Sequence, residues 1–200
     1  MIKLEKYNLP DIEILKYNES NILVWQPDKT YAILGQRDNI ESALNQENIL
    51  IDNVIVMQRP SGGHSVILSP NTLVVSIISF QSSLTEIKQF FRNCNNYIIN
   101  ALKDQGVKNL EIKGVSDIVL NGKKIVGSSM YRGKDYLFFH AVINISEKVE
   151  TIAKYLKHPD TEPDYRKGRN HLEFVTSILA QSYKINIKVL KSSLIQHYNN

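Results

Sequence analysis

A glycine-rich loop interrupts a strand-like stretch in the first half of the chain. Asn53–Gln58 has strand character, Arg59-Pro60-Ser61-Gly62-Gly63 breaks it, and strand character returns at Val66–Leu68 and Leu73–Phe80. Proline and adjacent glycines end regular structure, and glycine permits a close approach of backbone to ligand. The loop lacks the Gly-Lys-Ser/Thr of a Walker loop, and no helix opens after it as in a dinucleotide fingerprint. The pattern therefore predicts a strand-rich fold with a ligand-facing loop of another kind.

Further short apolar runs between turn residues are also typical of strands. Asn121-Gly122 is a strong hairpin signal between two of them, and Pro27-Asp28 indicates another turn. The additional strands that we expect are Asn21–Trp25, Tyr31–Leu34, Leu110–Lys113, Ile118–Leu120, Ile125–Met130, Tyr136–Ile145 and Ile185–Leu190.

Helical periodicity is clearest from Leu84 to Lys103, where apolar residues recur on one face. We expect helix starts at Ser83 with Glu86 in capping-box spacing, at Ser146, and at Asn170 with Glu173 in capping-box spacing. Strands in the middle with helices outside them predict an α+β fold with a mixed, largely antiparallel sheet and flanking helices.

The bulk composition is that of an ordinary globular protein. The chain has 200 residues, 42% of them apolar and 22% charged, and we expect residues 1–200 to form one domain without a separate C-terminal accessory domain. No apolar run spans a bilayer, and the N-terminus lacks a signal-peptide core, so we expect no membrane association and a cytoplasmic location. A net charge of +4 without dense basic and aromatic clusters favours acidic or phosphate-bearing ligands over nucleic acid.

The single cysteine, Cys94, excludes an internal disulfide and a multi-thiolate metal site within these residues. It falls in the apolar stripe of the expected long helix. We interpret it as a small buried hydrophobic residue.

Residues Arg59 to Val66 read R-P-S-G-G-H-S-V. Consecutive backbone N–H groups in such a loop can form an anion-binding nest. Arg59 adds a cationic fork for phosphate or carboxylate, and Ser61 adds a hydroxyl. The alternative is a plain turn between strands with a solvated arginine.

A second polar cluster surrounds the expected hairpin. Strand side chains alternate, so Lys123 and Lys124 point to opposite faces and one of them can enter a pocket. A pocket lysine can stabilise charge that develops between a carboxylate and an α-phosphate. Asp117 offers hard oxygen ligands for Mg²⁺. The alternative is a solvated hairpin tip with ordinary lysines.

At these two clusters the sequence resembles the biotin/lipoyl ligase superfamily, and most closely its lipoate–protein ligases. The matching stretches are Arg59–Val66, Ser116–Ile118, Gly122–Ser128 and His140–Ile143, preceded by Ile33–Asn39 and followed by Glu162–His171. The resemblance implies the class II biotin/lipoyl-synthetase-like fold. By the same resemblance, Lys124 is the essential catalytic lysine, Asp117 lies near phosphate or Mg²⁺, and His140 lies at the pocket wall. Residues that would bind substrate or ATP are Arg59, Ser61, Gly62, Gly63, His64, Asp117, Gly127, Ser128 and His140.

The chain also departs from the pattern of that family. His64 and Ser65 replace a glycine and a small residue, and His64 either narrows the pocket or adds a titratable group. Ser116, Val126 and Ala141 replace the usual Asn, Ser and Gly. We expect these changes to alter acyl specificity or to weaken the enzyme.

The resemblance implies that ATP and Mg²⁺ activate lipoate or octanoate to acyl-AMP, which a carrier lysine then attacks. One alternative is an octanoyl transferase, which would use a cysteine thiolate. Residues 155–160, which correspond to the position of that cysteine, contain none. Another alternative is a non-catalytic acyl- or nucleotide-binding relative. A biotin ligase lacks support because its glycine- and arginine-rich loop is absent.

The resemblance also implies partners. Acidic lipoyl carrier domains, from the E2 subunit of a 2-oxoacid dehydrogenase or the glycine cleavage H protein, would suit the net charge of +4. A separate accessory chain is a further expected partner, because many bacterial ligases have an additional C-terminal domain.

Overall fold

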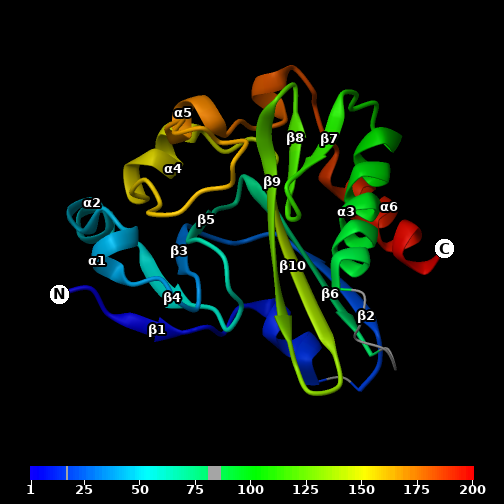
Figure 1. The fold of residues 1–200 in the computed structure, drawn as a ribbon, viewed down its shortest axis with the longest axis horizontal. Helices are drawn as coiled ribbons and strands as arrows, with labels where there is room; N and C mark the ends of the chain where they lie inside the picture. Colours follow the sequence, from blue (N-terminus) through cyan, green and yellow to red (C-terminus); the bar gives the residue numbers. More distant parts are fainter. Residues whose placement is uncertain (17, 81–86) are drawn as a thin grey trace.

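The computed structural model describes residues 1–16, 18–80 and 87–200, and in that part of the chain ten strands form two sheets (Figure 1). The smaller sheet contains, in spatial order, β1 (Leu4–Lys6), β4 (Ile55–Gln58), β3 (Tyr31–Leu34) and β5 (Val66–Leu68). The larger contains β2 (Asn21–Trp25), β6 (Thr72–Ser79), β10 (Leu137–Asn144), β9 (Lys123–Arg132), β8 (Asp117–Leu120) and β7 (Leu110–Lys113).

The larger sheet is antiparallel throughout, whereas β1, β4 and β3 run parallel in the smaller one. The predicted α+β class with mixed, largely antiparallel strands is therefore confirmed. The division into two sheets was not predicted. It matters for function because the glycine-rich loop joins β4 to β5 in the smaller sheet, while Lys124 lies in the larger one.

Two long helices, α3 (Ile87–Asp104) and α6 (Ile187–Asn199), pack against each other and cover one face of the larger sheet (Figure 1). Buried residues such as Ile98, Leu102 and Phe139 form the main core between these helices and the larger sheet. Cys94 is 1% exposed within this core, so its interpretation as a buried hydrophobic residue is confirmed.

Shorter helical segments surround the smaller sheet and its junction with the larger one. They are the 3₁₀ segment η1 (Pro10–Lys16), α1 (Ile40–Ala43), α2 (Gln46–Ile51), α4 (Val149–Tyr155), α5 (His171–Phe174) and the 3₁₀ segment η2 (Leu179–Gln181). The sequence reasoning did not predict β1, η1, α1 or α2, which are all short. None of the described helices has the length and apolarity needed to cross a membrane.

The predicted strand at Ile185–Leu190 is wrong, because this segment begins helix α6. The side chain of Asn186 caps the helix by accepting hydrogen bonds from the amides of Lys188 and Val189. Leu190 and Leu194, one helical turn apart, are both 0% exposed in the main core. Packing against α3 thus overrides the β-branched composition that suggested a strand.

Of the three predicted helix starts, one is confirmed, one is wrong and one lies outside the described residues. Asn170 and Glu173 form the predicted capping box at the start of α5, a helix that ends at Phe174. Ser146 is not a cap, because α4 begins after Lys148 and the Ser146 hydroxyl donates to Asn71. The predicted cap at Ser83 and Glu86 lies outside the described residues.

The Asn121-Gly122 hairpin is confirmed between β8 and β9, with φ values of 51° and 77° at its two residues. A register shift follows in the same strand pair. Ile118 pairs with Val126, but Val119 pairs with Lys124, so Ile125 is an extra residue in β9. Such a bulge changes which side chains share a face of the sheet.

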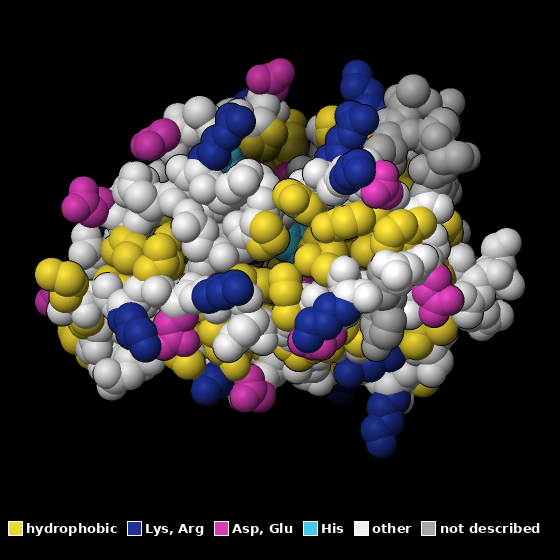
Figure 2. Space-filling view, turned by 90° about the horizontal axis from the view of Figure 1, so that it is seen from below, with side chains coloured by type: hydrophobic (Ala, Val, Ile, Leu, Met, Phe, Trp, Pro, Cys, Tyr) yellow, Lys and Arg dark blue, Asp and Glu magenta, His cyan; other side chains and the backbone are white. Residues whose placement is uncertain are grey.

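Hydrophobic side chains gather across the middle of the face seen from below, and Lys and Arg side chains stand separately around them (Figure 2). The two sheets meet above this face. The cavities described next lie at that junction.

Candidate functional site

Two cavities meet at Lys124. The first has a volume of about 450 Å³, the second about 370 Å³, and both are lined by Lys124 and Gly127 on β9. His64, from the loop between β4 and β5, also lines both cavities. The two motifs that the sequence singled out thus form one composite site between the sheets.

The bulge in β9 places Lys124 in this position. Strict alternation would put residues three apart on opposite faces of a strand. Because Ile125 is the extra residue of the bulge, Lys124 and Gly127 share a face. The lysine chain then folds over the glycine, whose Cβ, if it had one, would lie 2.9 Å from Nζ of Lys124. A side chain at Gly127 would therefore push the end of this lysine away from its present position. Lys123 lines neither cavity.

Asp117 fixes the end of the lysine side chain. Its Oδ1 atom lies 2.8 Å from Nζ of Lys124, and its side chain is 6% exposed. Oδ1 also accepts a 3.2 Å hydrogen bond from Ser116, and Oδ2 accepts a 2.6 Å bond from the hydroxyl of Tyr165. Burial and the negative charge of Asp117 raise the pKa of Tyr165, so the phenol stays protonated and donates.

Arg59 organises the glycine-rich loop from within. Its guanidinium donates to the carbonyls of Gly62 at 2.7 Å and His64 at 2.8 Å, and its Nε donates to Ser61 at 3.0 Å. The side chain is buried, and this burial lowers the pKa of Arg59 to about 10. The structure thus gives this arginine a contact that the sequence did not predict, namely the loop's own carbonyl groups.

The loop packs against the turn after β3. A Cβ at Gly35 would lie 1.8 Å from the carbonyl oxygen of Gly63, so any side chain there would displace the loop. Gly63 has a φ of +79°, a conformation that favours glycine. Ser65 donates a 2.6 Å hydrogen bond to Asp38 and ties the far end of the loop to the same turn.

Among the loop's central residues, Gly63 and His64 line the second cavity, whereas Gly62 lines neither cavity. Within the described residues, the backbone N–H groups of Gly62, Gly63 and His64 have no protein hydrogen-bond partner. Consecutive unpaired amides attract negative charge. The predicted nest therefore has the donors that it requires.

His140 joins this loop to the interior of the larger sheet. Its Nε2 atom lies 2.6 Å from the hydroxyl of Ser61 and 2.8 Å from that of Ser129. Its Nδ1 atom faces Asp11 at 3.5 Å. Burial lowers the pKa of His140, so the ring is neutral near pH 7.

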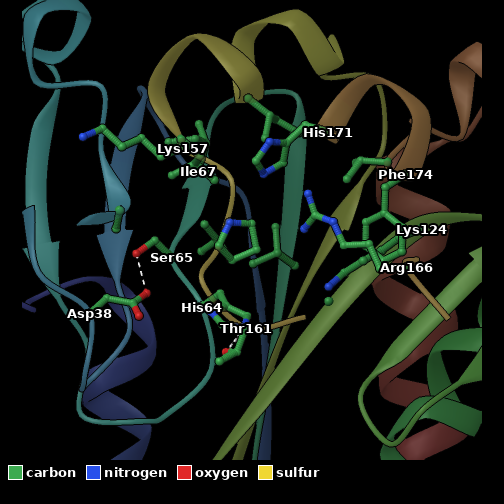
Figure 3. A pocket seen from close by; sticks show the side chains of 18 of the residues that line it. Asp38, His64, Ser65, Ile67, Lys124, Lys157, Thr161, Arg166, His171 and Phe174 are labelled. Carbon is green, nitrogen blue, oxygen red and sulfur yellow. Dashed lines mark hydrogen bonds between the residues drawn. The ribbon is translucent and has the colours of Figure 1, made fainter. Parts of the chain in front are cut away.

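The first cavity has basic and aromatic walls (Figure 3). Lys124, Arg166 and Phe174 lie on one side, opposite Asp38 and Ser65 from the smaller sheet. The guanidinium of Arg166 stacks 4.7 Å from the centre of the Phe174 ring. His64 and Thr161 approach each other to 3.4 Å across this cavity. Two more residues of the wall, Lys157 and His171, are also labelled in Figure 3.

His171 carries the largest pKa shift of this cavity wall. Burial, together with the positive charge of Arg166, lowers its pKa to about 4. It therefore remains neutral at pH 7 and contributes an imidazole dipole rather than a cation.

Most predicted site residues lie together at the two cavities. Ser128 lines the second cavity, but its hydroxyl donates to the carbonyl of Ser116 at 2.6 Å. The sequence reasoning missed Asp11, Ser129, Tyr165 and Arg166 as site residues. Tyr165 and Arg166 lie in the Glu162–His171 stretch, whose pattern had been noticed without a role. Ser129 belongs to the second polar cluster of the sequence but had no predicted role, and Asp11 gave no sequence signal, because only the fold brings it to His140.

The described residues contain no group of three or more His, Cys, Asp or Glu side chains placed to hold a metal ion. Asp117 alone provides a carboxylate at the cavity junction. A single carboxylate suits Mg²⁺ when phosphate and water supply its other ligands.

A family model described as the lipoyl protein ligase A/B catalytic domain matches residues 3–199. Lipoate–protein ligase 1 from Plasmodium falciparum is 28% identical over 191 residues, which are 96% of this chain and 42% of that protein. This chain spans less than half the length of the curated relative.

Solved structures share the fold. The bipartite lipoate–protein ligase of Thermoplasma acidophilum, described with its E2 lipoyl domain, has a TM-score of 0.80 and 18% identity, covering 94% of this chain and 75% of that one. A lipoate–protein ligase A bound with ATP has a TM-score of 0.78 and 17% identity, covering 100% and 83%. At these identities the likeness concerns the fold alone.

Proposed function

Because this chain belongs to the family of lipoyl protein ligase A/B catalytic domains, we propose that it activates lipoate or octanoate with ATP. The product would be an acyl-AMP, whose acyl group then passes to a lysine of a lipoyl carrier domain. The observation that carries this proposal is the meeting of two cavities at Lys124.

An acyl-adenylate has two unlike halves joined at a phosphate, and each of the two cavities would take one half. The second contains apolar side chains that suit an aliphatic acyl chain, namely Ile33, Leu68 and Val74, together with Val142, which lines both cavities. The first presents Lys157, Arg166 and Phe174, which suit phosphates and an aromatic base. Lys124 lies where the two halves would join.

Lys124 would stabilise the charge that develops as a carboxylate oxygen attacks the α-phosphorus and pyrophosphate leaves. Its ion pair with Asp117 holds the ammonium in place before substrate binds. The free amides of Gly62, Gly63 and His64 would bind a phosphate or carbonyl oxygen on the other side.

Asp117 would hold Mg²⁺ beside the phosphates, where the ion would neutralise part of their charge. Lys124 and Ser116 both contact Oδ1, whereas Oδ2 accepts only from Tyr165 and keeps one further lone pair for a cation. The carboxylate at this junction therefore fits a magnesium ion that keeps phosphate and water ligands.

In the second half-reaction a carrier lysine would attack the acyl carbonyl, and AMP would leave. This step needs positioning and charge stabilisation, which the loop amides and Lys124 can supply. The names of two relatives support the substrates: one ligase structure contains ATP, and another is described with its E2 lipoyl domain. The latter is bipartite, which supports a separate accessory chain as a further partner.

A cysteine-based octanoyl transferase is not favoured by the structure. Cys94, on the buried face of α3, lies in the main core, and burial raises the pKa of its thiol well above the usual range. A thiol in that state is a poor nucleophile. A non-catalytic relative that only binds a ligand would need the cavities. It would not need a lysine that an ion pair with Asp117 holds where the cavities meet.

The test uses an apo lipoyl domain incubated with the protein, lipoate and MgATP, with the mass of the domain as the readout. We expect a mass gain of one lipoyl group, which disappears when ATP is omitted. A parallel reaction contains the accessory chain, where one exists. Ligand binding without acyl-AMP or acylated domain in either reaction would refute the ligase.

A further inference from the structure

A line of three polar side chains runs from the interior of the larger sheet into the second cavity. Asp11, on η1, faces Nδ1 of His140 at 3.5 Å, and Nε2 of the same ring lies 2.8 Å from the hydroxyl of Ser129. The residues come from η1, β10 and β9, which the fold brings together. An acid, an imidazole and a hydroxyl in this order form the relay that activates serine nucleophiles.

The inner end of the relay is held firmly. Asp11 is 0% exposed and accepts hydrogen bonds from Tyr7 at 2.8 Å and from Ser76 at 3.2 Å. A distance of 3.5 Å to His140 is long for a hydrogen bond, and such catalytic contacts often shorten when substrate binds. Asp11 orients the ring so that Nδ1 carries its proton and Nε2 accepts.

Two hydroxyl groups compete for Nε2 of His140. Ser61 lies at 2.6 Å, is 1% exposed, and accepts hydrogen bonds from Arg59 and, at 2.8 Å, from the hydroxyl of Ser129. Ser129 lines the second cavity, where the acyl chain is proposed to bind, and Ser61 does not. Ser129 is therefore the hydroxyl that a substrate can reach.

Donors for an oxyanion lie next to this hydroxyl. A Cβ built at Gly63 would lie 3.5 Å from the Cβ of Ser129, so the glycine-rich loop passes directly beside it. The amides of Gly63 and His64 have no partner within the described residues. Unpaired amides beside a nucleophile are the arrangement that stabilises a tetrahedral intermediate.

We propose that Ser129 is a nucleophile that accepts an acyl group from a thioester, without ATP, and passes it to an amine. The inference rests on the proposed function for the identity of the acyl group. Lys124 and the nucleotide cavity would not take part in forming this intermediate.

The reaction balances in two steps. Oγ of Ser129 attacks the thioester carbonyl, a C–O bond forms, and its proton moves to Nε2 of His140. The C–S bond then breaks, and the leaving thiolate takes that proton. In the second step an amine attacks the ester carbonyl, a C–N bond forms and the C–Oγ bond breaks. The amine's proton returns through His140 to Oγ of Ser129.

The experiment incubates the full chain with octanoyl-coenzyme A and no ATP, followed by intact mass measurement and peptide mapping. We expect a gain of one octanoyl group on the peptide that contains Ser129. Ser129→Ala should abolish the adduct, and His140→Gln should slow its formation at least 100-fold. Ser129→Cys should restore a labile adduct, which a purely structural role for this hydroxyl would not predict.

Asp11 acts through His140 and is tested as a positioning residue. Asp11→Asn should slow adduct formation at least 10-fold and lower the pH at which the rate is half-maximal. The sign follows because Asp11 raises the pKa of His140, whereas burial and Arg59 lower it. Ser79→Ala is the matched control, since Ser79 is a buried serine of the neighbouring strand β6 without a side-chain bond to this network. It should form the adduct at the wild-type rate.

Two results would overturn the inference: a wild-type chain that forms no adduct, or an adduct that persists in Ser129→Ala. ATP-dependent ligation is measured on the same samples, so the two proposals can fail separately. Ligation without an adduct would contradict only the role of Ser129. An adduct on Ser129 without ligation in any reaction would contradict only the proposed ligase.

Discussion

Nζ of Lys124 lies 2.8 Å from Oδ1 of Asp117 across a strand pair whose register shifts between them. The shift turns the lysine toward Gly127, and the carboxylate then holds it at the junction of two cavities. The geometry explains why a lysine after a hairpin tip, usually a solvated residue, is directed into a site here.

Removing the amino group of Lys124 should abolish adenylate formation while leaving the fold intact. We expect Lys124→Ala to lower the rate of lipoyl-AMP formation at least 100-fold, the effect typical of losing one charge-stabilising donor. Lys123→Ala, on the adjacent residue outside both cavities, should stay within about 2-fold of wild type, in the range of measurement scatter. Equal losses in the two variants would contradict the assignment.

Tyr165 should matter through its hydrogen bond to Asp117. Tyr165→Phe removes only the hydroxyl that donates to Oδ2 at 2.6 Å. We expect a loss of about 1 kcal/mol, equivalent to about 5-fold in kcat/KM for adenylation. A Tyr165→Phe enzyme with unchanged kcat/KM would show that Asp117 does not need this donor.

Gly35 should tolerate no side chain. Its Cβ would meet the carbonyl oxygen of Gly63 at 1.8 Å, so Gly35→Ala must displace the loop or the turn. We expect destabilisation by about 2 to 4 kcal/mol, comparable with severe overpacking, in urea unfolding. Gly62→Ala is the matched substitution, because its Cβ meets no atom within 4 Å and should change the unfolding free energy far less.

Arg59 should contribute mainly to loop structure. Arg59→Lys cannot reproduce three donor contacts to Ser61, Gly62 and His64, and it leaves the partly buried carbonyl groups of Gly62 and His64 unpaired. We expect a loss of about 2 to 4 kcal/mol in the free energy of unfolding. If stability were unchanged and only ATP binding weakened, the arginine would be a direct phosphate ligand instead.

The stability of the protein should fall as pH decreases from 7 toward 4. Folded His171 has a pKa of about 4, whereas the unfolded chain binds this proton near the ordinary value of 6.5. The unfolded state therefore binds more protons throughout this window, and acid favours it. His140, whose pKa is also lowered by burial, acts in the same direction.

Urea unfolding at several pH values tests this linkage. His171→Gln should lose less unfolding free energy between pH 7 and pH 4 than wild type does. A variant with the same slope as wild type would show that His171 is protonated equally in the folded and unfolded states.

Several features were predictable because they depend on local sequence. The Asn121-Gly122 hairpin follows from residues that accept positive φ, and strands such as Asn21–Trp25 and Leu110–Lys113 have the predicted bounds. We predicted that the motifs around Arg59 and Lys124 form one site because both belong to a set of motifs that occurs in the same order in one family. From composition and periodicity alone, each motif could equally have been an ordinary turn.

Other features depend on contacts between distant segments. Asp11 and Ser129 reach His140 only through the packing of η1 and β9 around β10, which no local pattern encodes. Helix α6 was mistaken for a strand because its first residues are apolar and β-branched, whereas Leu190 and Leu194 bury the helix in the core next to α3. The bulge at Ile125 likewise gives no sequence signal, although it decides where Lys124 points.

The central claim is that the two halves of an acyl-adenylate occupy the two cavities and meet at Lys124. A crystal structure with a non-hydrolysable lipoyl-AMP analogue tests it most directly. We predict the acyl chain beside Val74 and Val142, the adenosine beside Arg166 and Phe174, and the linking group within hydrogen-bond reach of Lys124. An analogue bound entirely within one cavity, or with its linking group away from Lys124, would contradict the account.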